Sequence, residues 1–381
     1  MTNPLRDLEP AGQAVWLDYL HQDILKDGSL RRLIEADGVK GLTSNPAIFE
    51  KAIGDGQSYD ARVRQLASAG PAEGLPPEAL YEKLAIADIQ GAADIFRPTW
   101  ERLGGKDGFV SLEVSPRLAM DTEATVAEAR RLWRAVNRPN LMIKVPGTGP
   151  GVPAIRQLIG EGINVNVTLL FGLDAYLSVA EAHVAGLEAL RAAGKDVSAV
   201  HGVASFFVSR IDAKIDKAID ARLAGGEAED AAALKAVRGK VAIANAKNAY
   251  QHYLKLVGGE RWRALSADGA APQRLLWAST GVKDPAYPDT LYADSLIGPD
   301  TVDTLPPKTL DAFRDHGKVT QSLAHDVAGA EKVLAEAERL GLDLGKVTDE
   351  LVVEGVKLFA DAFDALLAAV AGKQAQLATA S

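Results

Sequence analysis

The sequence predicts a (β/α)8 TIM barrel, an α/β fold in which eight parallel strands close into a cylinder covered by helices. Short runs rich in β-branched and aromatic residues alternate with longer amphipathic stretches, as in a parallel sheet with crossover helices. Eight such runs occur, which is the number that closes this kind of barrel. Most of them end on a polar residue, at the position where parallel barrels carry their catalytic groups.

The predicted strands are bounded by polar, glycine-containing or proline-containing segments. In chain order they are AVWLDYL (14–20), GVKGLTS (38–44), FVSLEVS (109–115), NLMIKVP (140–146), INVNVTLLF (163–171), VASFFVSR (203–210), RLLWAST (274–280) and TLYADSLIG (290–298). Because side chains alternate along a strand, Asn164, Asn166 and Thr168 share one face, as do Met142 and Lys144. We expect these faces to line the barrel interior.

Helical patterns fill the segments between the strands. A helix is predicted over 122–136, with Thr122 as its N-cap, and another over 153–162, with proline near its start and glycine at its end. The segment 55–108 is too long for a simple connection. Its apolar spacing, carried by Leu80, Leu84, Phe96 and Trp100, predicts a helical insertion after the second strand.

Further helices are predicted at the C-terminal end, over about 308–372. Apolar residues recur there at alternating spacings of four and three, namely Val352, Val356, Phe359, Phe363, Leu366 and Val370. The tail 372–381 is predicted to be loose. No low-complexity linker or internal repeat divides the chain, so we expect residues 1–381 to form one domain.

The composition excludes several classes of protein. The chain of 381 residues is 47% hydrophobic and 24% charged, as is ordinary for an enzyme with a full core. Its formal charge of −9 argues against nucleic acid as a partner. The absence of cysteine excludes disulfides, thiolate metal sites and cysteine nucleophiles. Neither a signal peptide nor a membrane span is recognisable, and a cytoplasmic location is expected.

Common catalytic and cofactor motifs are also missing. The six histidines have no metal-ligand spacing such as HExxH, and no Gly-x-Ser-x-Gly elbow occurs. The glycine-rich GTGPG (147–151) lacks the full pattern of either a P-loop or a dinucleotide fingerprint. The sequence therefore predicts no metal and no cofactor.

Lys144 is the most unusual residue of the predicted strands, because it interrupts the apolar run LMIKVP. A lysine charge in a low-dielectric core is costly, so such an amine is normally paired or neutral. One interpretation is that Lys144 ends the strand and reaches water, with its stem covering apolar surface. The other is that it is a buried amine that acts as a nucleophile.

Polar residues at the other strand ends have the same two kinds of interpretation. Asp18 can be a solvated carboxylate, Glu113 can pair with Arg117, and Asn45 can cap a helix that begins at Pro46. The full set comprises Asp18, Asn45, Glu113, Lys144, Asn166 with Thr168, Ser205 with Arg210, and Ser279. Their recurrence at almost every strand end favours one shared active site.

These residues lie in motifs that together resemble the transaldolase family, from about residue 14 to past residue 310. The matching stretches are GLTSNPAIF, VSLEVSPRLAMDTEATVAEA, LMIKVPGT, GINVNVTLLF, VASFFVSRID and ADSLIGPDTVDTLP. Transaldolases are cofactor-free (β/α)8 barrels of the pentose phosphate pathway that form a Schiff base on a lysine of the fourth strand. The resemblance implies this role for Lys144.

The resemblance also implies roles for the remaining residues. Asp18 would be the general acid/base at the substrate C4 hydroxyl, while Glu113 would activate a water held by Thr168. Asn45 and Asn166 would bind substrate hydroxyls.

At the phosphate end, Ser205, Arg210 and Ser279 match the family pattern. The arginine expected two positions after Ser279 is absent, and Lys283 is a possible substitute. A lysine provides a point charge for phosphate but lacks the bidentate fork of arginine.

The main hypothesis is therefore transfer of a dihydroxyacetone unit between sugar phosphates, such as sedoheptulose 7-phosphate or fructose 6-phosphate as donor and glyceraldehyde 3-phosphate or erythrose 4-phosphate as acceptor. An alternative is a related aldolase that releases dihydroxyacetone, although the small aldolases have glutamine in place of Glu113 and lack the insertion 55–108. A second alternative is a catalytically silent sugar-phosphate-binding barrel, motivated by the missing arginine. The expected partners are sugar phosphates, without nucleic acid or membrane, and the expected state is a monomer or homodimer.

Overall fold

The strands of this protein form one closed parallel barrel. The computed structural model describes residues 3–54, 56–68, 75–226 and 229–379. Within these residues eight strands pair in chain order, and the eighth closes the barrel against the first. The predicted (β/α)8 architecture is confirmed.

The strands are short and almost completely buried, as expected for a parallel sheet covered on both faces. They are β1 Gln13–Asp18, β2 Gly41–Thr43, β3 Val110–Glu113, β4 Leu141–Pro146, β5 Val165–Leu170, β6 Gly202–Phe207, β7 Arg274–Ala278 and β8 Thr301–Leu305. Five of the first seven lie within the predicted segments, and β1 and β6 each begin one residue earlier than predicted.

The predicted eighth strand, 290–298, is wrong. This segment contains the short helix α14 (Leu291–Ser295), and the barrel closes with β8 at Thr301–Leu305. The sequence TVDTL of β8 has three polar residues in five positions, which is an unusual composition for a strand. All five residues are nevertheless buried, because β8 lies between β1 and β7.

Helices connect and cover the strands. The remaining ones are α1 Pro4–Asp7, α2 Gln22–Lys26, α3 Ser29–Asp37, α4 Pro46–Gly54, α5 Asp60–Ser68, α6 Pro77–Arg102, α7 Thr122–Val136, α8 Gly151–Glu161, α9 Leu173–Ala192, α10 Ser209–Ala224, α11 Ala231–Val237, α12 Val241–Val257, α13 Glu260–Ala267, α15 Pro307–His316, α16 Val327–Arg339 and α17 Leu344–Thr379. The helix predicted over 122–136 has these same bounds. Its N-cap, however, is Asp121, whose carboxylate accepts from the Ala124 amide at 3.0 Å, whereas the Thr122 hydroxyl donates to Pro150 O.

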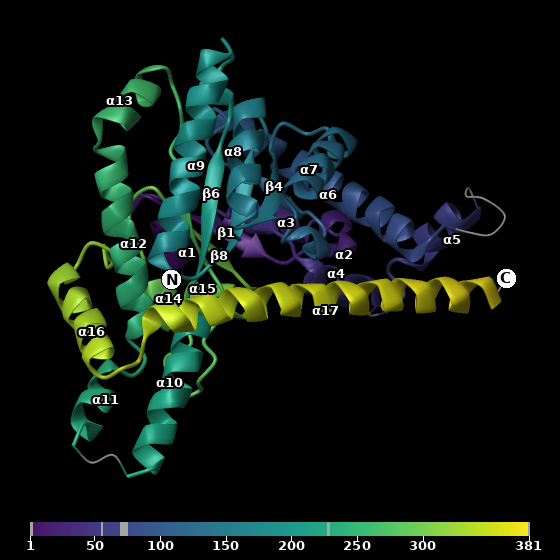
Figure 1. Ribbon diagram of the computed structural model, residues 1–381. Helices are drawn as coiled ribbons and strands as arrows, with labels where there is room; N and C mark the ends of the chain where they lie inside the picture. The colour runs from purple at the N-terminus through teal and green to yellow at the C-terminus, as the bar shows by residue number, and fades with distance from the viewer. Residues whose placement is uncertain (1–2, 55, 69–74, 227–228, 380–381) are drawn as a thin grey trace.

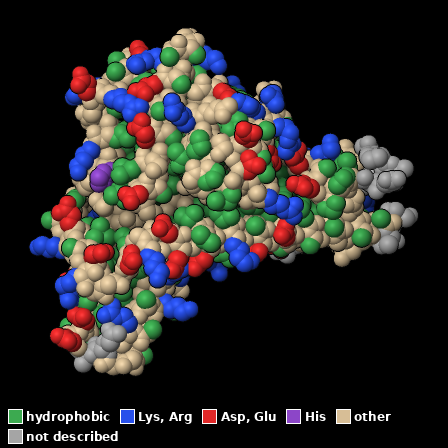
Figure 2. Space-filling view, in the orientation of Figure 1, with side chains coloured by type: hydrophobic (Ala, Val, Ile, Leu, Met, Phe, Trp, Pro, Cys, Tyr) green, Lys and Arg blue, Asp and Glu red, His purple; other side chains and the backbone are tan. Residues whose placement is uncertain are grey.

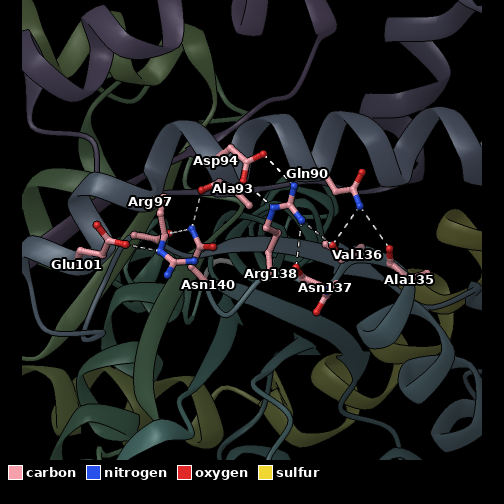
Figure 3. Close-up of polar contacts among 11 residues, drawn as sticks. Gln90, Ala93, Asp94, Arg97, Glu101, Ala135, Val136, Asn137, Arg138 and Asn140 are labelled. Carbon is pink, nitrogen blue, oxygen red and sulfur yellow. Dashed lines mark hydrogen bonds and ion pairs between the residues drawn. The ribbon is translucent and has the colours of Figure 1, made fainter.

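The predicted insertion is helical, and it includes α5 and α6. Residues 55 and 69–74 of the insertion lie outside the described residues. The C-terminal half of α6 is attached to the turn before β4: Arg138 binds Asp94 with two hydrogen bonds, and the Asn140 amide donates to Ala93 O (Figure 3). These contacts fix α6 relative to the strand that carries Lys144.

Helix α17 is longer than predicted and crosses the molecule, as the yellow helix in Figure 1 shows. It contacts α4, α5, α6, α10 and the end of β5. The tail predicted to be loose continues this helix to Thr379, and residues 380–381 lie outside the described part of the chain. The Lys373 ammonium donates to Asp60 and to Gly56 O, which holds the end of α17 against α5.

The visible surface carries interspersed acidic and basic side chains (Figure 2). No helix among the described residues is long and apolar enough to cross a membrane.

Candidate active site

A large cavity lies at the carboxyl ends of the strands. Its volume is about 1050 Å3, and side chains from strands on all sides of the barrel line it. Eight of the ten predicted site residues are among its lining residues: Asp18, Asn45, Lys144, Thr168, Ser205, Arg210, Ser279 and Lys283. Glu113 and Asn166 lie adjacent to these residues but deeper.

Lys144 is a buried amine. Its side chain is 6% exposed, so it does not extend into open water. The Nζ atom donates to Ser44 O at 3.1 Å and lies 3.6 Å from Glu113 Oε2. The Phe359 ring of α17 covers it, with the ring centroid 5.9 Å from Nζ. The interpretation in which Lys144 reaches open water is therefore wrong, and the structure places its amine in a buried position.

Glu113, at the end of β3, is an equally buried carboxylate. Burial raises its pKa to about 7, although the neighbouring Lys144 charge acts in the opposite direction. Lys144 and Glu113 are also aligned with each other across the β3–β4 pair. The alternative interpretation, in which Glu113 pairs with Arg117, is wrong, because Arg117 binds Asp364 of α17.

Three buried oxygens near Lys144 lack a hydrogen-bond partner among the described residues. They are both carboxylate oxygens of Glu113 and the hydroxyl of Thr168. Buried polar atoms are normally satisfied by protein groups or by ordered water. The arrangement therefore suits a water molecule close to the amine.

Asp18 ends β1 and lines the same cavity as Lys144. Its carboxylate accepts from the Thr43 hydroxyl at 2.7 Å, and Thr43 also contacts the Thr304 hydroxyl at 2.7 Å. Burial raises the pKa of Asp18, and the charges of Lys144 and Lys283 partly oppose this shift. Asp18 is thus placed where it can exchange a proton with a ligand in the cavity.

Asn45 and Asn166 have different positions. The side-chain oxygen Oδ1 of Asn45 accepts from the Ile48 amide at 3.0 Å and so caps α4. The side-chain nitrogen of Asn45 remains available at the cavity. Asn166 is fully buried in β5, below the open cavity. It donates to Ser111 Oγ at 3.0 Å and accepts from Ser205 Oγ at 2.7 Å. The second N–H of its amide has no hydrogen-bond partner among the described residues.

Two cations gather at the far side of the cavity. Arg210 is the second residue of α10, not part of β6 as predicted, and its guanidinium lies 5.4 Å from the Phe207 ring centroid. Burial and then the Arg210 charge lower the pKa of Lys283. Neither cation forms an ion pair with any residue that the structure describes. An anionic ligand would supply the missing partner.

Ser279 lies beside these cations. It follows β7 with a φ of +55°, and its hydroxyl is 3.1 Å from that of Ser209. Gly281 occupies the position two residues after Ser279, where the family pattern has arginine, and it also lines the cavity. Lys283 therefore reaches the site from two residues further along the same loop.

Several further residues line or shape the site without having been predicted from the sequence. They are Tyr19, Thr43, Lys51, Ser209, Thr304, Lys308 and Phe359. Lys51 and Lys308 lie shortly after the motifs NPAIF and LPP, so their positions in the sequence could have indicated further cations near the site. Phe359 carries no local signal beyond its place on an apolar helix face, since only tertiary packing brings α17 over Lys144.

Comparisons with known proteins agree with this arrangement. The family model described as Transaldolase/Fructose-6-phosphate aldolase matches residues 15–370. A protein named Transaldolase 2 from Nostoc punctiforme is 50% identical over 370 residues, covering 96% of each chain. A protein named Transaldolase from Thermobifida fusca is 48% identical, covering 97% of this chain and 98% of its own. Another of the same name from Trichodesmium erythraeum is 47% identical, covering 96% of each chain.

Proposed function

The chain belongs to the transaldolase/fructose-6-phosphate aldolase family, and from this premise we propose that it transfers a dihydroxyacetone unit between sugar phosphates through a Schiff base on Lys144. The protein is an enzyme of the transaldolase type, since relatives of that name match it over almost its whole length. The roles of individual residues follow from their positions around Lys144.

The reaction begins at the Lys144 amine. Glu113, 3.6 Å away, takes the proton that keeps this amine from reacting, and its pKa of about 7 suits that exchange. The neutral amine then attacks the ketone of the donor to give a carbinolamine, which loses water to become a protonated imine. A water held between Glu113 and Thr168 carries the protons of these steps.

Carbon–carbon bond cleavage follows at the other side of the imine. Asp18 takes the proton of the C4 hydroxyl while the C3–C4 bond breaks, and the imine accepts the electron pair. After the first aldose leaves, Asn45 and Asn166 hold the three-carbon unit by its hydroxyls. The acceptor aldehyde then enters, and Asp18 returns the proton to the new hydroxyl.

The phosphate of each substrate binds at the cationic side of the cavity. Arg210 offers a planar fork for two phosphate oxygens, whereas Lys283 offers a point charge. Ser279 adds a hydroxyl donor, while Ser205 is placed to orient the Asn166 amide. A cytoplasmic location and a monomeric or dimeric state stay predictions.

The observation that carries this function is the burial of Lys144 beside Glu113 in a cavity that also contains Asp18. The test is to incubate the protein with fructose 6-phosphate, reduce it with borohydride and locate added mass by peptide mass spectrometry. We expect a three-carbon adduct on Lys144 and none in Lys144→Ala. A folded protein without an adduct at Lys144 would contradict the mechanism.

Transfer and release are distinguished by the acceptor. The carboxylate at position 113 and the insertion that contains α6 favour transfer over release of dihydroxyacetone. Turnover of fructose 6-phosphate should therefore depend on added glyceraldehyde 3-phosphate. Steady formation of free dihydroxyacetone without any acceptor aldehyde would instead identify the aldolase reaction.

A further inference from the structure

The loop between β7 and α14 carries two residues of the proposed phosphate site. This segment, residues 279–290, is called the Lys283 loop below; it begins with Ser279, and both Ser279 and Lys283 line the large cavity. The residue after Lys283 is Asp284, whose carboxylate binds Arg238. The Lys283 loop is therefore attached to the rest of the molecule directly beside its cavity-lining cation.

Arg238, the residue that follows α11, binds three side chains at once. Its guanidinium donates to Asp284 Oδ2 at 2.8 Å, to the two carboxylate oxygens of Asp220 at 2.9 Å and 3.0 Å, and to the Tyr287 hydroxyl. Its Cζ atom also lies 5.3 Å from the centroid of the Tyr287 ring. Asp284 and Tyr287 belong to the Lys283 loop, whereas Asp220 belongs to α10. Arg238 thus joins this loop to α10.

A second connection to α10 runs through Tyr287. Its hydroxyl donates to Asp216 Oδ2 at 2.8 Å, while the Gly239 amide donates to Asp216 Oδ1 at 2.9 Å. Gly239 has a φ of +69°, and a Cβ atom at this position would lie only 2.6 Å from the Tyr287 phenol. Glycine therefore leaves the space in which the phenol reaches Asp216.

Helix α10 links these contacts to the cavity. Asp216 and Asp220 lie four residues apart and so share one face of the helix. Arg210 is in the first turn of the same helix and lines the cavity. A loop that is fixed to Asp216 and Asp220 is therefore also fixed relative to Arg210.

The two cations of the site need such support when no anion is bound. Burial and then the Arg210 charge lower the pKa of Lys283, as expected for like charges close to each other. This repulsion favours a loop position farther from Arg210, and phosphate binding would then have to order the loop again. Contacts that hold the loop without phosphate remove that cost from binding.

We propose that Arg238 is a positioning residue of the phosphate site, which holds the Lys283 loop so that Lys283 stays beside Arg210. The proposal rests on the proposed phosphate-binding role of Lys283. Arg238 is not among the described residues that line the cavity, and its charge is balanced by Asp220 and Asp284. Its effect on a substrate therefore passes through Lys283 and is confined to the phosphorylated end.

Two variants test this role. Arg238→Met removes the guanidinium but keeps an apolar stem. Tyr287→Phe removes the hydroxyl that lies between Arg238 and Asp216, and it leaves the charge unchanged.

Each variant has a matched control outside the Lys283 loop. Arg261→Met removes an arginine of α13 that also binds two carboxylates, those of Glu181 and Glu188. Tyr250→Phe removes a phenol that donates to Pro299 O at 3.1 Å.

The initial rate of adduct formation on Lys144, trapped with borohydride, is measured over a range of fructose 6-phosphate concentrations. We expect both loop variants to raise the half-saturating concentration about threefold to tenfold, with little change in the maximal rate. Inhibition by inorganic phosphate should weaken by the same factor. Dihydroxyacetone, which carries no phosphate, should form the adduct equally well in the loop variants, the controls and the unaltered protein.

A double variant shows whether Arg238 acts through Lys283. When Arg238→Met is added to Lys283→Ala, the half-saturating concentration should stay that of Lys283→Ala alone. A further increase of the same size as in Arg238→Met alone would overturn the positioning role.

Two other results would also overturn the positioning role. One is an unchanged half-saturating concentration in both loop variants, and the other is an equal loss of adduct formation from dihydroxyacetone. If Arg238→Met loses helical circular dichroism, Tyr287→Phe decides the outcome. An unaltered protein that forms no adduct on Lys144 would contradict the proposed function itself.

Discussion

The pairing of Lys144 with Glu113 serves both the stability of the fold and the chemistry of the site. A buried ammonium without a partner would be strongly destabilising, and the neighbouring carboxylate removes much of that penalty. Burial raises the pKa of the same carboxylate to about 7, so Glu113 can accept a proton near neutral pH. The pair can therefore be stable in the resting enzyme and still produce a neutral amine.

The substitution Lys283→Ala tests the second phosphate contact. A charge-assisted hydrogen bond contributes about 1.5–3 kcal/mol, so we expect the KM for the ketose phosphate to rise about ten- to hundredfold, while kcat changes little. Lys283→Arg should retain most of the affinity. Steady-state kinetics measure both constants, with Lys195→Ala, at an exposed lysine outside the cavity, as the control. An unchanged KM in Lys283→Ala, together with a raised KM in Lys308→Ala, would transfer the role to Lys308.

Asp303 predicts a particular dependence of stability on pH. Burial raises its pKa to about 8, opposed only by a hydrogen bond from Thr280. Between its unfolded pKa of about 4 and its folded pKa of about 8, the folded state binds more protons than the unfolded state, so this group lowers stability as pH rises. In the unaltered protein this group lowers the free energy of unfolding by up to about 1.4 kcal/mol for each pH unit in this range. Asp303→Asn should abolish that decrease.

Urea unfolding at several pH values between 5 and 8 measures the effect of Asp303→Asn. The difference in free energy of unfolding between the variant and the unaltered protein should increase with pH. Asp349→Asn, at an exposed position of α17, should show no such trend. A difference that stays constant over this range would show that Asp303 does not have a raised pKa.

At the scale of elements, α17 is the part of the molecule that completes the site. Its Phe359 covers Lys144 from above, and its Phe363 packs against Tyr81 of the insertion. A single helix thus contacts both the reactive amine and the helical insertion. Apolar cover of this kind excludes water from the amine and from any imine formed on it.

Phe359→Ala should therefore admit water to the imine. We expect the rate of transfer to fall about tenfold and the release of free dihydroxyacetone without acceptor to rise. Product analysis after incubation with fructose 6-phosphate measures both. Leu358→Ala, which changes the adjacent and 53% exposed side chain, is the control. Equal behaviour of the two variants would exclude a covering role for Phe359.

At the scale of the whole molecule, the barrel, the insertion and the C-terminal helix share contacts. Helix α17 contacts α4 and α6, while α6 is attached to the turn before β4 (Figure 3). Hydrophobic side chains of all these elements belong to one buried cluster. These shared contacts favour unfolding as a single unit.

Equilibrium unfolding in urea tests whether the barrel, the insertion and α17 unfold together. Tryptophan fluorescence reports on all five tryptophans, which include Trp16 and Trp277 of the barrel and Trp100 of the insertion. Far-ultraviolet circular dichroism reports mainly on the helices. We expect the two transitions to coincide. A separate early loss of helical signal would indicate that the insertion or α17 unfolds before the barrel.

The sequence by itself determined the barrel and most of its inner chemistry. Seven strands were recognisable because apolar runs alternate with amphipathic helices, and the alternation of side chains placed Lys144, Asn166 and Thr168 on inward faces. The eighth strand was not recognisable, because Thr301, Asp303 and Thr304 give it a polar composition. Only its position between β1 and β7 buries those residues.

The tertiary structure decided which groups meet across long distances in the chain. Glu113 and Lys144 were predicted as separate strand-end residues, but their contact arises from the pairing of β3 with β4. The position of Phe359 over Lys144 and of Tyr81 beside Glu113 depends on how α17 and α6 pack on the barrel. Local periodicity shows which face of a helix is buried, but not against which partner, because that choice depends on the shape and packing of all elements together.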